Sequence, residues 1–480
     1  MINSRLNCVT ILGVIATVLM VGCGPSRAER QAQKDERIWS EDLASVSKAA
    51  YTTPVSSSER ECLGRHAFNV AGRVEWPSDP GNSYMFSPRQ SASIYDVHDG
   101  IEVGSTRVAV VSDPKREEFN WQFKKLDLDR KNSINWNTKD IATWTDWLAR
   151  TTSDEERKSL EERIHNDELS MARARLDHRF ETGIPDSLGV WESEYPDELR
   201  ADDDRRNNRH QTLTAYVYRK PWLHIFEQTG PAGQPQANEA RMREFLQRFR
   251  ARAEFEIPTQ QGLCIPYGFI ADDGKTPFRM KLGMRYRDVP GVIYVIDTGV
   301  LNDQTPPGGG ALWDALGVSG VGLLGAAVPE NVKIVERIGP KKVRINGRGG
   351  IESGVVARVE GLSESEKDDA NHRADYTPAQ LKKVLNRPPY EVYTVYAGTN
   401  AKPDSQALPW LAVKMRTFAR NQVEEGELAS DPPPFAQSQP RFEGLLNSIG
   451  LRATTPALPE VAALGKGYGE TSQPLASKPE

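Results

Sequence analysis

The sequence predicts an α+β protein of two domains, each a largely antiparallel β-sheet with packed helices, after a cleaved signal segment and a flexible tether. Its 480 residues are enough for two or three domains of ordinary size. Residues 355–359 and 411–417 alternate apolar and polar side chains with the two-residue period of a strand. Residues 238–253 instead repeat apolar side chains at helical spacing. Strands and helices therefore follow one another in one chain.

The first 22 residues have the pattern of a secretory signal peptide. Arg5 provides a positive charge, and residues 9–21 form an apolar run. A helix that crosses a membrane needs about 20 apolar residues, so this run is too short to span one comfortably. We therefore expect residues 1–22 to be removed. An uncleaved anchor is the alternative.

The segment Leu19-Met20-Val21-Gly22-Cys23 resembles the lipobox of bacterial lipoproteins. The resemblance implies that the Cys23 thiol is acylated and that Cys23 becomes the first residue of the mature chain. Stable anchoring takes about two acyl chains, and a lipoprotein cysteine carries more. The residue after Cys23 is Gly24 and not aspartate, which by the usual bacterial sorting pattern implies sorting to the inner leaflet of the outer membrane. An ordinary secretory signal without lipid is the alternative.

Residues 23–58 are expected to form the tether, because they are rich in polar and small residues with few apolar anchors. A flexible coil of this length reaches roughly 30–35 Å. Part of it, around residues 30–50, is expected to be helical. Such a segment would let an anchored domain stand away from the membrane surface.

Composition excludes some classes of protein. The formal net charge is −5, and it becomes −6 once Arg5 leaves with the signal. A nucleic-acid-binding protein normally has a basic footprint, so we predict no nucleic-acid partner. Hydrophobic residues make up 38% of the chain and the mean hydropathy is −0.57, which is polar but sufficient for packed cores.

Four cysteines are present, and Cys8 leaves with the signal while Cys23 carries lipid. Only Cys62 and Cys264 remain, in a compartment that oxidises thiols. We predict that they form a disulfide bond. Closing so long a loop would stabilise the fold by about 5 kcal/mol as an upper figure. Two unrelated buried cysteines are the alternative.

The N-terminal domain is expected to span residues 59–330. Strand-like segments run to about residue 142, and a charged helical insertion is expected over 150–210. Ser153 and Glu156 form a capping-box pattern that predicts where its helix begins. After the helix at 238–253, strands are expected over residues 262–270 and 292–296, the second of them central because it is continuously apolar.

The C-terminal domain is expected to span residues 331–455, after a boundary near 329–331. It contains the two alternating strands named above. Residues 441–449 predict a helix, with Gly450 placed to end it. The last segment, 456–480, is rich in proline, glycine and alanine and is predicted to be disordered.

One glycine-rich stretch imitates known catalytic motifs. Gly320, Gly322 and Gly325 have the spacing of a dinucleotide-binding fingerprint, which also requires an acidic residue about 20 positions on. Glu336 is too close to serve, and no strand clearly precedes the motif. Ser319 is not part of a nucleophile elbow, because that motif needs a glycine two residues after the serine and Val321 stands there. We interpret the stretch as a packing segment or an interdomain loop.

Metal and acid–base sites are not evident in the sequence either. Asp127-Leu128-Asp129 begins like a calcium loop, but the following positions lack the required oxygen ligand and glycine. The seven histidines are scattered singly, and we interpret His66 and His224 as packed or surface residues. Asp272-Asp273 is interpreted as part of a turn. We predict no catalytic residues, no metal, no cofactor and no enzymatic activity.

Several segments of the chain together carry a family resemblance. They are Glu61-Cys62-Leu63-Gly64-Arg65-His66-Ala67-Phe68 and the stretches 257–265, 268–270, 347–354, 390–397, 409–416 and 445–452. In this order they resemble the immunity proteins against class-four lipase effectors of the bacterial type VI secretion system. The resemblance covers residues of about 60–455 and includes both remaining cysteines.

This resemblance implies an exported two-domain protein that binds a phospholipase effector stoichiometrically. Its two domains would grip the effector and hinder opening of the lid over the active site. The implied partners are the cognate effector and, through Cys23, the membrane. We expect part of the binding surface to lie in an interdomain cleft around Pro329. The alternatives are an envelope structural or assembly lipoprotein and a lipoprotein enzyme without a recognisable motif.

Overall fold

The computed structural model divides the chain into two compact units, Met1–Glu41 and Asp42–Glu480. In the first unit, the helix α1 (Arg27–Thr52) begins, and Arg37 forms an ion pair with Glu41 one turn later. The helix continues into the second unit. The structure describes residues 27–52, 59–76, 100–112, 116–175, 179–191, 210–231, 234–289, 291–300, 331–362, 367–368, 371–372, 377–386, 388–417 and 431–465.

The end of α1 belongs to the second unit. Val46 and Ser47 are fully buried, and the Tyr51 hydroxyl donates a hydrogen bond of 3.0 Å to the carbonyl of Thr454. The expected helix around residues 30–50 is therefore present. The expectation of a flexible tether is wrong for residues 42–52, because an apolar side chain of this stretch is buried in the folded unit.

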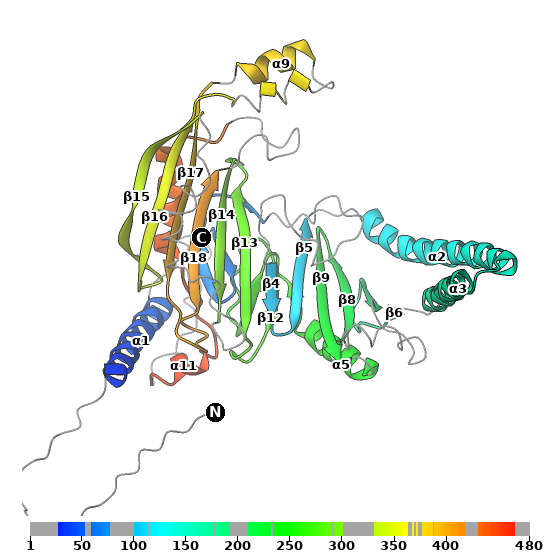
Figure 1. The fold of residues 1–480 in the computed structure, drawn as a ribbon. Helices are drawn as coiled ribbons and strands as arrows, with labels where there is room; N and C mark the ends of the chain where they lie inside the picture. Colours follow the sequence, from blue (N-terminus) through cyan, green and yellow to red (C-terminus); the bar gives the residue numbers. More distant parts are fainter. Residues whose placement is uncertain are drawn as a thin grey trace, which may run out of the picture. The chain divides into compact units, whose positions relative to one another are not determined.

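A single 13-stranded sheet dominates the second unit (Figure 1). Neighbouring strands in it pair antiparallel wherever the structure describes them. The strand order is β15 (Val332–Ile345), β16 (Arg348–Val359), β17 (Tyr390–Thr399), β18 (Trp410–Thr417), β14 (Val292–Gly299), β13 (Phe278–Tyr286), β4 (Gly100–Val103), β5 (Thr106–Ser112), β9 (Trp222–Pro231), β8 (His210–Arg219), β7 (Ser187–Trp191) and β6 (Arg179–Phe180), and β3 (Val74–Glu75) pairs with β13.

The sheet is continuous across the predicted domain boundary. Strand β14 precedes that boundary and pairs along its full length with β18, which follows it. The α+β class and the antiparallel sheet agree with the prediction, and β14 is central as expected. Strands from both predicted domains nevertheless share one sheet, and the division at residues 330/331 stays a prediction.

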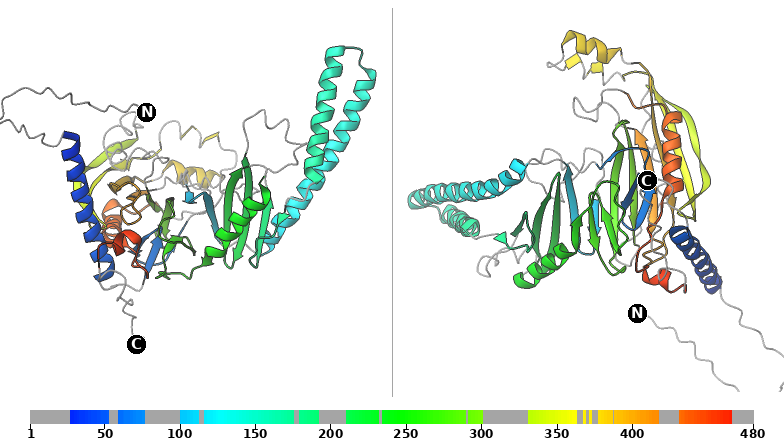
Figure 2. Two further views of the ribbon diagram at one scale, coloured as in Figure 1. Left: turned by 90° about the horizontal axis from the view of Figure 1, so that it is seen from below. Right: turned by 180° about the vertical axis from the view of Figure 1, so that it is seen from behind.

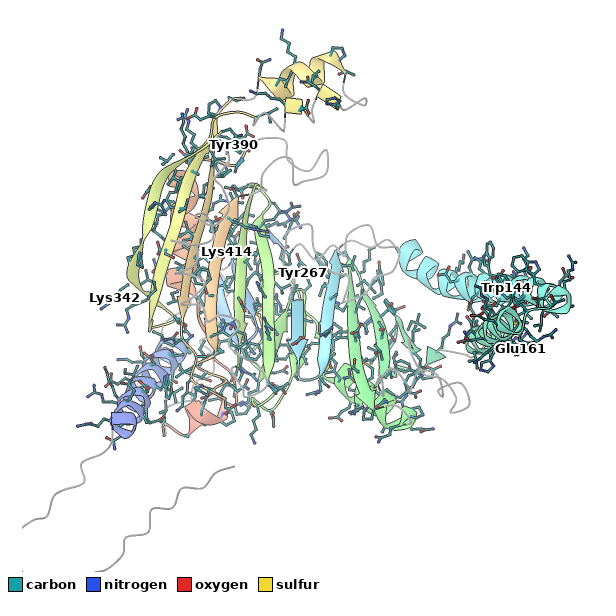
Figure 3. The ribbon with its side chains drawn as sticks, in the orientation of Figure 1. Trp144, Glu161, Tyr267, Lys342, Tyr390 and Lys414 are labelled. Carbon is teal, nitrogen blue, oxygen red and sulfur yellow. A yellow bond between two sulfur atoms is a disulfide. The ribbon has the colours of Figure 1, made fainter. Side chains whose placement is uncertain are left out.

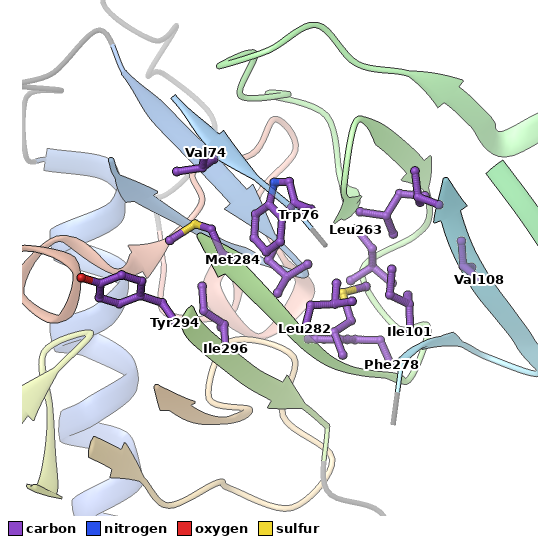
Figure 4. Close-up of a cluster of buried hydrophobic side chains, with 14 of the residues drawn as sticks. Val74, Trp76, Ile101, Val108, Leu263, Phe278, Leu282, Met284, Tyr294 and Ile296 are labelled. Atoms are coloured by element: carbon purple, nitrogen blue, oxygen red, sulfur yellow. The ribbon is translucent and has the colours of Figure 1, made fainter. Parts of the chain in front are cut away.

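One face of this sheet carries the main hydrophobic core. Side chains of β13, β14 and β4 meet Trp76 and Leu263 there (Figure 4). The same cluster includes side chains of the helices α5 (Pro235–Arg248) and α10 (Phe435–Ser448). The helix predicted at 238–253 is thus present as α5, with Met242, Phe245 and Leu246 buried as its spacing indicates.

The second unit also contains two small antiparallel sheets. They consist of β1 (Arg60–Leu63), β2 (His66–Asn69) and β19 (Gly450–Leu451), and of β10 (Phe249–Ala251), β12 (Gly268–Ala271) and β11 (Gly262–Ile265). The single strand expected over 262–270 is therefore a hairpin. It turns at Tyr267, whose φ of 54° is left-handed.

A disulfide bond joins the two small sheets. Cys62 of β1 and Cys264 of β11 are both fully buried and their Cα atoms are 5.7 Å apart. Backbone hydrogen bonds between Gly64 and Cys264 run beside it, at 2.8 and 2.9 Å. The bond that the cysteine arithmetic predicts is present, and it ties the start of the folded unit to its middle.

The largest difference from the sequence prediction is a helical hairpin. Strand-like segments were expected up to about residue 142, whereas the structure has the helix α2 (Arg116–Arg150) followed by α3 (Asp154–Arg175). The two helices pack side by side (Figure 2). The start of α3 agrees with the capping pattern, because the Ser153 hydroxyl accepts a hydrogen bond of 3.4 Å from the Glu156 amide.

Two expectations near the C-terminus are corrected. Gly450 does not end α10, because the extended residue Ile449 is the cap and Gly450 already begins β19. Residues 456–465 were expected to be disordered, yet they form α11 (Pro459–Ala462), in which Val461 is fully buried. The Glu460 carboxylate accepts a 2.6 Å hydrogen bond from the Ser405 hydroxyl, which fixes this end on the loop before β18.

Candidate interaction surface

Some charged residues in the segments that carry the family resemblance are buried and have a structural role. Arg65 lies in the turn between β1 and β2, and its guanidinium forms an ion pair of 2.6 Å with Asp272; their side chains are 2% and 0% exposed. Arg65 also donates a hydrogen bond of 2.9 Å to Gln406. Removing one partner of a buried ion pair strands the other charge and costs about 3–5 kcal/mol. Arg65 therefore holds the hairpin β11–β12 and the loop before β18 together.

Two further buried cations complete this network. Arg252 pairs with Glu61 at 2.7 Å, with both side chains 1% exposed. Arg452 donates hydrogen bonds to the carbonyls of Gln260 and Gly262, at 2.7 and 2.5 Å. Burial and the neighbouring Arg65 lower the pKa of Arg452 to about 9. These buried residues bind other parts of the same chain, so they stabilise the fold and do not belong to an exposed binding surface.

The two singled-out histidines are packed residues. His66 and His224 are 2% and 0% exposed, and desolvation lowers the pKa of each to about 3, which keeps both rings neutral. The Nε2 atom of His224 lies 3.3 Å from the Pro266 carbonyl. Within the described ranges, no group of three His, Cys, Asp or Glu side chains is arranged to hold a metal ion.

The remaining motif candidates have structural roles or lie outside the described residues. Asp127 belongs to α2 and forms an ion pair of 2.6 Å with Arg179. Asp272 and Asp273 form turn hydrogen bonds with the amides two residues on, at 3.0 and 3.1 Å, as expected. The candidates from the sequence analysis that lie outside the described ranges are Cys23, Ser319, Gly320, Gly322, Gly325 and Pro329.

The most exposed part of the sheet is its edge strand β15, which directly follows the predicted boundary. Its sequence VKIVERIGPKKVRI contains five basic residues and one acidic residue. Most of these side chains are exposed, while Ile338 and Ile345 face the core. Because β16 is its only strand partner in the described part of the sheet, β15 leaves one row of backbone groups open.

Strand register separates four of the five basic residues into two sets. Lys341 lies opposite Glu352 on the core face and forms an ion pair of 2.8 Å with it. Arg337, Lys342 and Arg344 lie on the opposite face, where their partners across β16 are Val355, Ile351 and Gly349. These uncharged neighbours provide no compensation. Lys342 lies at the outer edge of the sheet (Figure 3).

We call Arg337, Lys342 and Arg344 the edge cations. The edge cations are all exposed, and Arg344 donates a hydrogen bond of 2.7 Å to the Gly347 carbonyl. Among the described residues, neither Arg337 nor Lys342 has a carboxylate within 4.0 Å. Exposed guanidinium and ammonium groups of this kind bind carboxylates of a partner through charge-assisted hydrogen bonds.

The edge is built against simple strand addition. The register shifts between Ile334 and Glu336 and between Ile338 and Lys341, where Gly339 and Pro340 interrupt the ladder. Bulges and proline are the usual protection of an open sheet edge. A partner would therefore be recognised by the side chains of β15 rather than by its backbone.

Residues 256–454 match the family model of the Tle cognate immunity protein 4 C-terminal domain. The resemblance to lipase-effector immunity proteins is thereby confirmed for these residues. The match begins well before residue 331 and so includes β11 to β14 with the later strands.

Solved structures that match this chain include the immunity protein TplEi of the type VI secretion system of Pseudomonas aeruginosa, complexed with an "L" peptide and in its apo form. Each is 15% identical, with a TM-score of 0.41; the matches cover 82% and 83% of this chain and 98% of the other. The Tle4–Tli4 complex also matches at 14% identity and a TM-score of 0.41, covering 83% of this chain and 98% of that chain. No curated protein sequence matches. None of the helices in the described part of the chain is long and apolar enough to cross a membrane.

Proposed function

We propose that this chain is a periplasmic immunity lipoprotein that binds a cognate type VI secreted phospholipase and blocks its active-site entrance or lid. The observation that carries the proposal is the domain-family match over residues 256–454. The protein needs no catalytic group of its own for this task, because inhibition requires complementary shape and charge. Anchoring through Cys23 to the inner leaflet of the outer membrane would keep it beside the lipid that the effector attacks.

The edge cations supply a specific part of the proposed effector-binding surface. They lie on one face of β15, are exposed and face uncharged neighbours on β16. A positive patch on a chain of net charge −5 favours a local acidic region on the partner and speeds their encounter. We expect the reversals Arg337→Glu, Lys342→Glu and Arg344→Glu together to weaken effector binding about tenfold or more, mainly through slower association.

The matched control reverses three exposed lysines elsewhere. Lys124, Lys131 and Lys158 lie on α2 and α3, so Lys→Glu changes there alter net charge by the same amount. Equal weakening by both triple variants would show a general charge effect and would remove β15 from the interface. Raising the salt concentration should reduce the difference between the wild type and the edge variant.

Protection in living cells tests the function itself. A candidate cognate type VI phospholipase is directed to the periplasm of a host, with or without the full-length chain. Growth should be rescued by the full-length chain and not by a form lacking residues 1–22, which would stay in the cytoplasm. A missing rescue by the full-length chain, at normal expression, would favour the envelope structural alternative. Rescue by both forms would contradict the proposed location.

A further inference from the structure

Polar contacts make up most of the described interface between the helices α2 and α3. Among the described residues of the hairpin only Leu160 is buried, at 4% exposure. The polar contacts include hydrogen bonds of 3.0 Å between Asn137 and Ser170 and from the Trp144 indole to Asp167, and Arg130 donates hydrogen bonds of 2.7 and 2.9 Å to the last carbonyls of α3. Long helices draw most of their stability from packing an apolar face. The described part of this hairpin would therefore gain stability if a further surface covered it.

Two exposed tryptophans identify that uncovered face. Trp136 and Trp147 are 67% and 51% exposed, whereas Trp144 lies against α3 beneath Arg163, whose guanidinium is 5.1 Å from the ring centre. Eleven residues are three helical turns, so Trp136 and Trp147 lie on one line about 16 Å apart. Single exposed apolar side chains are common, but tryptophan is the residue most enriched at the energetic centre of interfaces.

The charges around these tryptophans decide which partner fits. Between Asp129 and Arg150, the side of α2 that carries the two tryptophans holds two basic residues, Lys139 and Arg150, and two acidic residues, Asp129 and Asp140. A nucleic acid or an anionic membrane surface would require an excess of basic residues. A strongly charged protein partner would require an excess of the opposite sign. A nearly neutral face of mixed sign is complementary to itself.

We propose that the tryptophan face of α2 binds the same face of a second copy of this chain. A twofold axis near Ile141 and Ala142, perpendicular to the helix, places Trp136 opposite Trp147 of the second copy, and the reverse. The same axis sets Thr143, a small residue, opposite Asp140 of the second copy, so the helices can approach closely between the two tryptophan contacts. The two hairpins then form a four-helix assembly with an isologous interface.

This pairing is independent of effector binding and of the edge cations. The hairpin lies in the chain between β5 and β6, and β6 is at the opposite end of the strand order from β15, so each copy could still bind its own partner. An effector bound to the tryptophan face is a different outcome, and the experiment below separates the two by the size of the product.

Crosslinking of the full-length chain in cells tests the proposal. With Cys62 and Cys264 bonded and Cys23 expected to be acylated, Thr143→Cys introduces the one reactive thiol. A short bismaleimide should then give a product of twice the chain mass. The control Leu128→Cys is also exposed, but lies about 20 Å along α2 from the proposed twofold axis, so its two copies would be about 40 Å apart and should give at least tenfold less product.

A second variant tests the role of the tryptophans. Trp136→Ala with Trp147→Ala, added to Thr143→Cys, should lower the yield of the dimer at least tenfold at an unchanged protein level. Both side chains are exposed, so folding should be retained, which far-ultraviolet circular dichroism of the purified chain would show. Equal yields from Thr143→Cys and Leu128→Cys, no dimer from either, or a product with a different protein would overturn the proposal.

Discussion

Asp272 is the residue whose neutralisation should most clearly expose the buried network. Its side chain is fully buried and accepts hydrogen bonds of 3.1 and 2.6 Å from Nη1 and Nη2 of Arg65. Asp272→Asn keeps the shape and the turn acceptor for the Gly274 amide, but it leaves the Arg65 charge buried without a counter-ion. Breaking a buried pair in this way should lower the free energy of unfolding by about 3–5 kcal/mol.

Urea unfolding followed by tryptophan fluorescence measures this change. With a slope of about 3 kcal/mol per molar, the midpoint should fall by about 1–1.7 M at an unchanged slope. The neighbouring Asp273→Asn is the matched control, because Asp273 is exposed and forms only the local turn bond to the Lys275 amide. It should change stability by less than about 0.5 kcal/mol.

A double variant separates the ion pair from simple packing. Arg65→Met with Asp272→Leu removes both charges together, and replacing a buried ion pair by apolar groups is often nearly neutral. The double variant should therefore be more stable than Asp272→Asn alone. Equal urea midpoints for Asp272→Asn and Asp273→Asn would refute the role assigned to Arg65. So would a double variant whose loss of stability equals the sum of the losses caused by Arg65→Met alone and Asp272→Leu alone.

Three further outcomes are expected. Cys62→Ala with Cys264→Ala should lower the free energy of unfolding by about 2–5 kcal/mol, measured by urea unfolding, and adding reductant should then have no further effect. His66 and His224 have folded pKa values of about 3, below the ordinary 6.5, so the unfolded chain binds more protons than the folded chain. The free energy of unfolding should therefore be at its full value above pH 6.5 and fall by up to about 2.7 kcal/mol per pH unit between pH 6.5 and 3. Thermal unfolding across this pH range measures the change, and a constant melting temperature would contradict it. Val461→Ala should cost about 1–3 kcal/mol because its side chain is fully buried, whereas a disordered tail would leave the melting temperature unchanged.

Local patterns in the sequence predicted several elements well. The apolar spacing of Met242, Phe245 and Leu246 gave the buried face of α5, and Ser153 marked the start of α3. Pairing of Cys62 with Cys264 followed from their number and expected compartment. Each of these depends on neighbours in sequence or on chemistry that admits few alternatives.

Features that depend on distant parts of the chain were missed. The sheet continues from β14 to β18 because strands more than 100 residues apart pair, and no local pattern reports such pairing. Helix α2 has a weak apolar stripe and packs on α3, so its sequence did not stand out. Residues around Val461 belong to a segment rich in proline, glycine and alanine, which predicts disorder, yet one buried side chain and the Glu460 contact hold them in place.

The buried cations show the same limit at the level of sites. Arg65 and Arg452 belong to segments that carry the family resemblance, but their sequence gives no sign that both are buried. The edge cations were likewise not singled out, since a basic strand normally indicates only a solvated face. Their position on one face of an open sheet edge becomes visible only from the pairing of β15 with β16.

The central claim is that this protein inhibits a phospholipase by binding it. The most direct test mixes the full-length, oxidised chain with a purified candidate cognate phospholipase and measures phospholipid hydrolysis against the molar ratio. We predict that hydrolysis falls linearly and reaches its minimum near one chain per enzyme. Undiminished hydrolysis at several-fold excess of the chain, with no complex on a sizing column, would contradict it.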